Sequence, residues 1–193
     1  VLTEMVEIRD AIAYFDSADY LHRFATLARE ARPDTRIYLY ETWHTVDDPE
    51  GWQTRLEKDR ARYWEDGILR PALAYDTPPL PIYVIPVGQV FTEIVRQIKA
   101  DALVGLNAQE ELFARNEDGT LDPIHMDHLG NYIVAITHYA VLYQKSPIGL
   151  PSNVKLFDES SLFSMPSENL SEKLQSIVWD VVKADPLTGM TKN

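Results

Sequence analysis

The chain has 193 residues, and its 30 acidic against 18 basic side chains give a formal net charge of −12. Apolar residues make up 45% of it and charged residues 25%, which is typical of a globular chain with a core and not of a disordered one. The acidic balance argues against unassisted binding to nucleic acid or anionic membranes, because both demand positive charge. The absence of cysteine excludes disulfides, thiol nucleophiles and thiolate metal sites. No apolar run reaches the roughly 18 residues that a membrane span needs.

The sequence opens on Val1-Leu2-Thr3, which is typical of a short strand. A natural protein rarely begins inside such an element, and no charged and then apolar leader precedes it. We therefore expect an N-terminal portion of the fold to be absent, cleaved or carried on another chain. An ordinary processed terminus is the alternative.

Amphipathic helices alternate with short apolar strands along the rest of the chain. The spacing of apolar residues predicts helices over residues 17–31, 51–66, 90–98, 129–143 and 170–181. Ser17 is a suitable N-cap for the first of them, and the second is expected to be a charge-laced surface helix. Continuous apolar character predicts strands over residues 36–41 and 82–86.

Polar or proline-rich segments predict the connections. We expect a proline-rich connection over 71–81, a turn over 116–119, a polar loop over 122–128 and a loop over 152–167. Alternation of helix and strand is typical of an open α/β sheet with parallel strands. Two or three strands are visible where a sheet usually has about 4–6, a second indication of missing N-terminal strands. The chain is expected to be one domain over 1–193, incomplete at its N-terminus, with a C-terminal loop and covering helix over 151–193.

Three segments follow strand ends or lie in comparable loops, where α/β sheets place their active sites: residues 3–7, 41–44 and 122–125. The last is the most informative. Asp122, three residues before His125, can fold back so that its carboxylate accepts a ring N–H, which leaves the other ring nitrogen free as a general base. Gly130 lets the following helix begin close to neighbouring backbone. The alternative is a hydrogen bond that only stabilises the loop.

Residues 122–132, Asp-Pro-Ile-His-Met-Asp-His-Leu-Gly-Asn-Tyr, resemble the last conserved block of the SGNH (GDSL-type) hydrolases. That block is Asp-x-x-His with a Gly five residues after the His, opening the C-terminal helix. The resemblance implies a three-layer α/β/α, flavodoxin-like fold and ester hydrolysis by a Ser, Asp and His triad. The family's oxyanion hole uses the Ser backbone N–H, a Gly and an Asn. By resemblance, Asp122 is the orienting acid and His125 the general base.

The resemblance covers about Val1 to Leu150 and has departures. Pro123 stands where the family usually has Gly, and Met126 where it usually has Pro. The chain has no Gly-Asp-Ser-type block and no clear Gly-x-Asn-Asp block, so the nucleophile is expected before Val1, on a missing or separate N-terminal segment. Serines inside the chain fit the role poorly: Ser17 is better explained as a cap, and the others considered follow the His in loop-like sequence, at positions 146, 152, 160, 161 and 164.

Trp43 and His44 follow the clearest strand and are expected to face the crevice and line a substrate pocket. The alternative packs Trp43 under the proline-rich connection and leaves His44 solvated. Glu4 and Glu7 can also reach the crevice, although a solvated acidic turn is favoured over that role.

The leading hypothesis is a serine ester hydrolase of SGNH type that deacylates a sugar, a short-acyl ester or a lipid ester. Trp43 and the tyrosines favour carbohydrate, and no cofactor is expected. One alternative is a non-catalytic SGNH-like binding or interaction domain. The other is a metal site at Asp122, His125 and His128, with Asp127 and a distant His44 as further candidates. The family's frequent export implies a periplasmic or secreted location by resemblance only.

Overall fold

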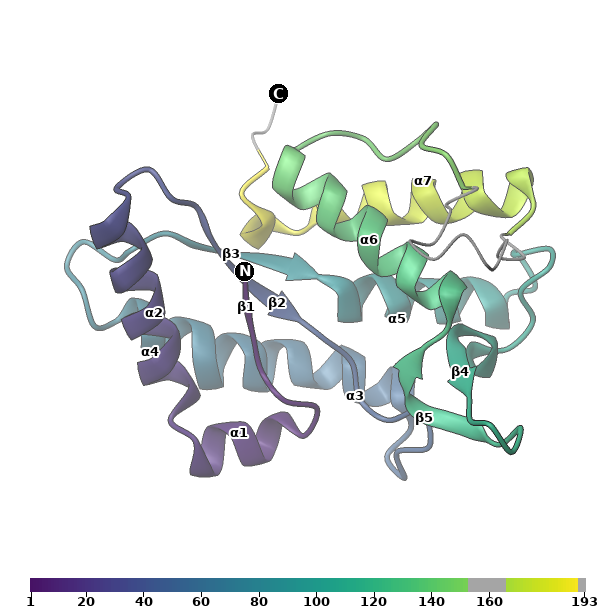
Figure 1. The fold of residues 1–193 in the computed structure, drawn as a ribbon, viewed down its shortest axis with the longest axis horizontal. Helices are drawn as coiled ribbons and strands as arrows, with labels where there is room; N and C mark the ends of the chain where they lie inside the picture. The colour runs from purple at the N-terminus through teal and green to yellow at the C-terminus, as the bar shows by residue number, and fades with distance from the viewer. Residues whose placement is uncertain (153–165, 191–193) are drawn as a thin grey trace.

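A parallel sheet of three strands lies at the centre of the computed structural model, which describes residues 1–152 and 166–190 (Figure 1). The strands are β1 (Leu2–Thr3), β2 (Ile37–Glu41) and β3 (Ile82–Pro86), in the order β1-β2-β3. β2 and β3 pair along their whole length, and β1 adds two residue pairs at one edge. The predicted parallel α/β character is confirmed.

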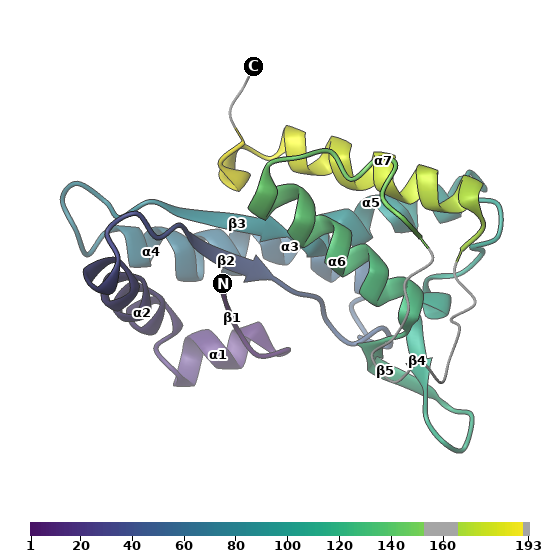
Figure 2. The same ribbon diagram turned by 45° about the horizontal axis from the view of Figure 1, so that its top comes forward.

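Helices cover both faces of this sheet, and Figures 1 and 2 show α1 and α2 on one side and α6 and α7 on the other. The helical segments are α1 (Ile8–Tyr14), α2 (Ser17–Ala31), α3 (Trp52–Asp59), the π-helix η1 (Arg60–Leu69), α4 (Arg70–Leu73), α5 (Val87–Lys99), the 3₁₀ turn η2 (Gln109–Leu112), α6 (His128–Tyr143), α7 (Glu168–Ala184) and the 3₁₀ turn η3 (Pro186–Thr188). Among the described residues, no helix is both long and apolar enough to cross a bilayer.

The sheet separates two hydrophobic clusters, because successive side chains of a strand point to opposite faces. Leu39 packs with Leu21 and Ile68 under α2 and η1. Its neighbour Tyr38 belongs to the other cluster, which is built on α5, α6 and α7 and contains Phe91. The helices thereby fix the sheet from both sides and leave its carboxyl-terminal edge to the loops.

The helix predicted over 51–66 is longer and more buried than expected. It runs from Trp52 through η1 and α4 to Leu73, so the irregular connection begins after that point and not at Pro71. Trp64 and Ile68 are buried against the sheet and carry the helix onward. The loop predicted over 152–167 lies almost wholly outside the described residues.

The segment 122–128, predicted as a polar loop, instead contributes to an antiparallel ribbon of β4 (Phe113–Arg115) and β5 (Leu121–Met126). The predicted turn over 116–119 joins the two strands, with the Asn116 N–H donating to the Thr120 carbonyl at 2.9 Å. The ladder pairs Phe113 with Met126 and Arg115 with Leu121, so residues 122–125 bulge out of it. The polar character that suggested a loop belongs to this bulge.

Candidate functional site

Asp122 and His125 contact each other within the bulge. His125 Nδ1 lies 2.8 Å from Asp122 Oδ2, and Asp122 Oδ1 accepts the backbone N–H groups of Ile124 at 3.0 Å and of His125 at 2.9 Å. These hydrogen bonds, led by the backbone N–H of His125, lower the pKa of Asp122 to about 2. The expected fold-back of the Asp onto the imidazole is therefore present, and the carboxylate is ionised at neutral pH.

The imidazole of His125 is oriented on one side and open on the other. An ionised carboxylate only accepts hydrogen bonds, so the proton of the neutral ring sits on Nδ1 and Nε2 carries the free lone pair. The side chain is 78% exposed, and no described residue bonds Nε2. A ring nitrogen in that state is able to take a proton from a hydroxyl brought to it.

Two hydrogen bonds fasten the bulge to the segment after β2. The Trp43 indole N–H donates to the Ile124 carbonyl at 2.7 Å, and the Val46 N–H donates to the Pro123 carbonyl at 2.8 Å. The Trp43 ring also packs edge-on against Phe91 of α5 at 5.5 Å between centroids. The Asp122–His125 pair is thereby held at the carboxyl-terminal edge of the parallel sheet.

The start of α6 fixes the other end of the bulge. Asp127 caps the helix by accepting the Gly130 N–H at 2.9 Å, and its own N–H donates to the Leu112 carbonyl at 2.9 Å. A Cβ on Gly130 would lie 2.5 Å from that same carbonyl oxygen. The expectation that Gly130 lets this helix begin close to neighbouring backbone is confirmed.

His44 lies in the interior. Its Nε2 is 3.2 Å from Asp59 Oδ2, its Nδ1 is 3.4 Å from an Arg55 nitrogen, and its carbonyl accepts the Trp52 indole N–H. Burial, with the Arg55 charge next in size, lowers the pKa of His44, so the ring is neutral at pH 7. The ring contacts protein groups and is not exposed to solvent. Of the two residues predicted to line a pocket, only Trp43 adjoins the Asp122–His125 pair.

Arg55, which the sequence placed on a surface helix, is fully buried beside His44. Its guanidinium binds Asp59 and Asp48 at 2.6 Å each and Glu7 at 3.4 Å. Glu7 is also bonded to Arg9, which lowers the pKa of the Glu7 carboxyl to about 2. Glu7 is thus part of an ion network and is not in a freely solvated acidic turn.

A second buried network lies at the end of β2. Glu41 is 1% exposed and binds Arg60 of η1 and, at 2.7 Å, Gln89 of α5. Arg60 also reaches Asp185, just after α7, at 2.8 Å. Burial raises the pKa of Glu41 despite the opposing charge of Arg60. In the sequence, this network is indicated by Glu41, an acidic residue at the end of an otherwise apolar strand.

Of the other sequence candidates, those within the described residues are not assembled into a further site. Ser17 is the first residue of α2 and the cap position belongs to Asp16, so Ser17 is not the N-cap. Three of the serines considered as nucleophiles, Ser160, Ser161 and Ser164, lie outside the described residues. Within residues 1–152 and 166–190, no group of three or more His, Asp or Glu side chains is arranged to hold a metal ion.

Comparison with known proteins returned no similarity to set beside this geometry. No family model matches the chain, and neither a curated protein nor a solved structure matches it. Function is therefore inferred from the residues around Asp122 and His125.

Proposed function

We propose that Asp122 and His125 are the acid–base pair of a serine ester hydrolase of SGNH type, and that a serine outside residues 1–193 supplies the nucleophile. The observation that carries this proposal is the doubly fixed carboxylate: one Asp122 oxygen holds two backbone N–H groups and the other holds His125 Nδ1. A carboxylate fixed in this way orients an imidazole whose second nitrogen is open to a reacting group.

The proposed reaction uses His125 twice. Nε2 takes the proton of the serine hydroxyl as its oxygen attacks the ester carbonyl, and then returns that proton to the departing alcohol. Water repeats the sequence on the acyl-enzyme and releases the acid. Asp122 stays ionised throughout, holds the Nδ1 proton and stabilises the imidazolium.

The place of the pair in the fold supports the proposal. Open α/β sheets bind ligands beyond the carboxyl ends of their strands, and Trp43 and Val46 tie the bulge to that edge. In this proposal, the three strands are part of a larger flavodoxin-like sheet. The substrate is an ester of a sugar, a short acyl group or a lipid, and the half-buried Trp43 ring beside the bulge favours a saccharide.

The test uses a polypeptide that carries both these residues and the proposed serine. A fluorophosphonate, which reacts covalently with activated serines, is used to label it. His125→Ala and Asp122→Asn are expected to slow labelling by about 10²–10⁴-fold, the usual contribution of general acid–base catalysis. Asp118→Asn is the matched control, because Asp118 lies in the turn of the same ribbon and its side chain is hydrogen-bonded to Thr120, not to His125. Its labelling rate is expected to be unchanged.

Three outcomes separate the alternatives. Labelling that survives His125→Ala at the full rate refutes the acid–base role. A folded polypeptide that no fluorophosphonate labels and that turns over no ester points to the non-catalytic binding domain. Ester hydrolysis that a chelator abolishes and His128→Ala weakens points to the metal site.

A further inference from the structure

His44 lies between the two hydrogen bonds that hold the bulge of residues 122–125. Trp43, the residue before it, donates its indole N–H to one carbonyl of the bulge at 2.7 Å. Val46, two residues after it, donates its backbone N–H to another at 2.8 Å. The His44 carbonyl itself accepts the Trp52 indole N–H at 3.0 Å. A movement of the His44 backbone would therefore disturb both attachments of the bulge.

The His44 ring is held in an ion network as a neutral group. Its Nδ1 lies 3.4 Å from Nη2 of Arg55, which donates hydrogen bonds and cannot accept them, so Nδ1 is the acceptor there. The ring proton is then on Nε2, which lies 3.2 Å from Asp59 Oδ2. The ring is 4% exposed, so water does not reach it freely. A second proton would lie on Nδ1, where it would oppose both the N–H group and the positive charge of Arg55.

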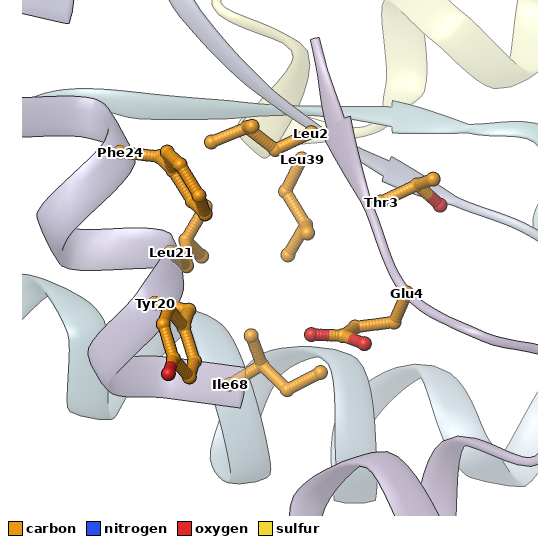
Figure 3. A pocket seen from close by; sticks show the side chains of 8 residues that line it. All are labelled: Leu2, Thr3, Glu4, Tyr20, Leu21, Phe24, Leu39 and Ile68. Carbon is orange, nitrogen blue, oxygen red and sulfur yellow. The ribbon is translucent and has the colours of Figure 1, made fainter. Parts of the chain in front are cut away.

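The other charged groups that face the ring are carboxylates bound to the same guanidinium. They are Asp59 on α3, Asp48 in the turn after the segment, and Glu7 at the start of α1. Glu4, the other acid after β1, lies at an apolar hollow between β1 and α2, as Figure 3 shows. The three carboxylates favour a charged ring, but burial and the Arg55 charge outweigh them, and the pKa of His44 is lowered.

We propose that His44 is a positioning residue for the Asp122–His125 pair, and that it holds the bulge only while its ring is neutral. Protonation breaks the contact with Arg55, segment 43–46 loses its support on α3, and the two hydrogen bonds to the bulge open with it. The bulge is thereby coupled to acidity through a group outside the pair. The consequence for catalysis rests on the proposed function, whereas the coupling is measured on the bulge itself.

The size of the effect follows from the two protonation equilibria of His44. When segment 43–46 opens, the ring meets water and its pKa returns to about 6.5. Opening is therefore favoured about tenfold more for each pH unit between that value and the folded-state pKa. The support from neutral His44 is present above the unfolded pKa and is lost as the pH falls through the folded-state pKa.

The test follows hydrogen exchange of the Val46 amide in the 193-residue chain by NMR, between about pH 8 and pH 5. Its protection factor compares the measured exchange rate with that of an unstructured amide at the same pH. We expect this factor to fall about tenfold per pH unit below about 6.5, while the ring carbons of His44 titrate over the same range. His44→Gln cannot take the proton, but its amide is able to accept from Arg55 and donate to Asp59. Its Val46 protection is expected not to change with pH.

The matched control is His138→Gln. Burial also lowers the pKa of His138, but its ring packs against Tyr40 at 4.6 Å between centroids, and its Nδ1 bonds the Val134 carbonyl of its own helix. The pH dependence of the wild-type chain is expected to persist in this variant. His125 still titrates in both variants, so an effect that His125 itself causes survives in His44→Gln.

Four results overturn the proposal: Val46 protection that does not change with pH in the wild-type chain, an equal loss of protection in His44→Gln, a loss that His138→Gln removes, or a His44 titration over a different pH range from the loss. The last comparison needs only the wild-type chain, so it decides the matter even where circular dichroism finds His44→Gln unfolded. Fluorophosphonate labelling that His125→Ala slows, together with pH-independent Val46 protection, refutes this inference and leaves the proposed function standing. The reverse pair of results refutes the proposed function alone.

Discussion

Replacing Arg60 by Met would remove the cation that faces Glu41, the most deeply buried carboxylate among the residues that the structure describes. The Arg60 guanidinium binds Glu41, Glu65 and Asp185, and Glu41 is 1% exposed at the end of β2. In the variant the hydrogen bond from Gln89 remains, but no positive charge replaces the one removed.

A buried pair that loses one partner usually costs about 3–5 kcal/mol, a large fraction of the ~5–15 kcal/mol by which a domain is stable. At about 2–4 °C per kcal/mol for a chain of this size, the melting temperature is expected to fall by about 6–20 °C. Loss of Arg60 also raises the pKa of Glu41 further, because the Arg60 charge is the largest influence that lowers it. A carboxyl whose pKa is higher in the folded than in the unfolded chain stabilises the fold at low pH, and this stabilisation is lost as the pH rises through the folded-state pKa. The defect is therefore expected to shrink as the pH falls.

Urea unfolding of the variant and the wild-type chain at pH 7 and pH 5 measures both effects. Arg70→Met is the matched control: Arg70 also binds Glu65, but it is 63% exposed, and its loss is expected to cost at most about 1 kcal/mol. Adding Glu41→Gln to Arg60→Met is expected to restore part of the stability. An Arg60→Met chain that is as stable as the Arg70→Met chain, or equally weakened at both pH values, would refute this reasoning.

Three further predictions concern the candidate site. Gly130→Ala is expected to lower the unfolding free energy by about 1–3 kcal/mol, because the new methyl group is overpacked against a backbone carbonyl. In Gly67→Ala the methyl group meets mainly the flexible end of a side chain, so a smaller loss is expected. Thermal melts of the two variants compare these losses. The pKa of Asp122, followed by carbon-13 NMR, is expected to be about 2 and to stay below 3.8 in His125→Ala, because the largest cause of its lowering is a hydrogen bond from a backbone N–H. The ionised Asp122 carboxylate stabilises the fold at pH values above its unfolded pKa, and this stabilisation is lost as the pH falls through the folded pKa. A pKa of 3.8 in His125→Ala would contradict the role of the backbone N–H groups. Trp43→Phe removes one hydrogen bond and is expected to lower the unfolding free energy by about 0.5–1.5 kcal/mol in urea titrations, while no change would mean that this bond does not hold the bulge.

Local sequence patterns predicted the parts of the fold that depend on local spacing. The apolar spacing over 17–31 and the apolar runs over 36–41 and 82–86 correspond to α2, β2 and β3, because helical and extended periodicity are properties of neighbouring residues. The sequence does not predict the ribbon of β4 and β5, because its bulge interrupts the alternation of apolar and polar residues that identifies a strand.

In the candidate site, too, the sequence predicts the local contacts and not the distant ones. The contact between Asp122 and His125 spans three residues, so their spacing was enough to predict it. The hydrogen bond from Trp43 to Ile124 joins positions 81 residues apart, and no local pattern marks it. The charge of Arg55 and Arg60 predicts a solvated helix, because charge normally indicates exposure, whereas here two carboxylates from other segments bind each guanidinium.

The bond from Arg60 to Asp185 also bears on the order in which the chain is made. It joins residues 125 positions apart, so the charges around Glu41 are complete only when the turn after α7 is in place. Such distant contacts form late and slow the folding of a domain. During synthesis, β2 and η1 leave the ribosome well before the acid that completes their cluster. A nascent chain that has not yet extended to Asp185 therefore lacks this partner of Arg60, and the ion cluster around Glu41 is completed only after α7 has been made.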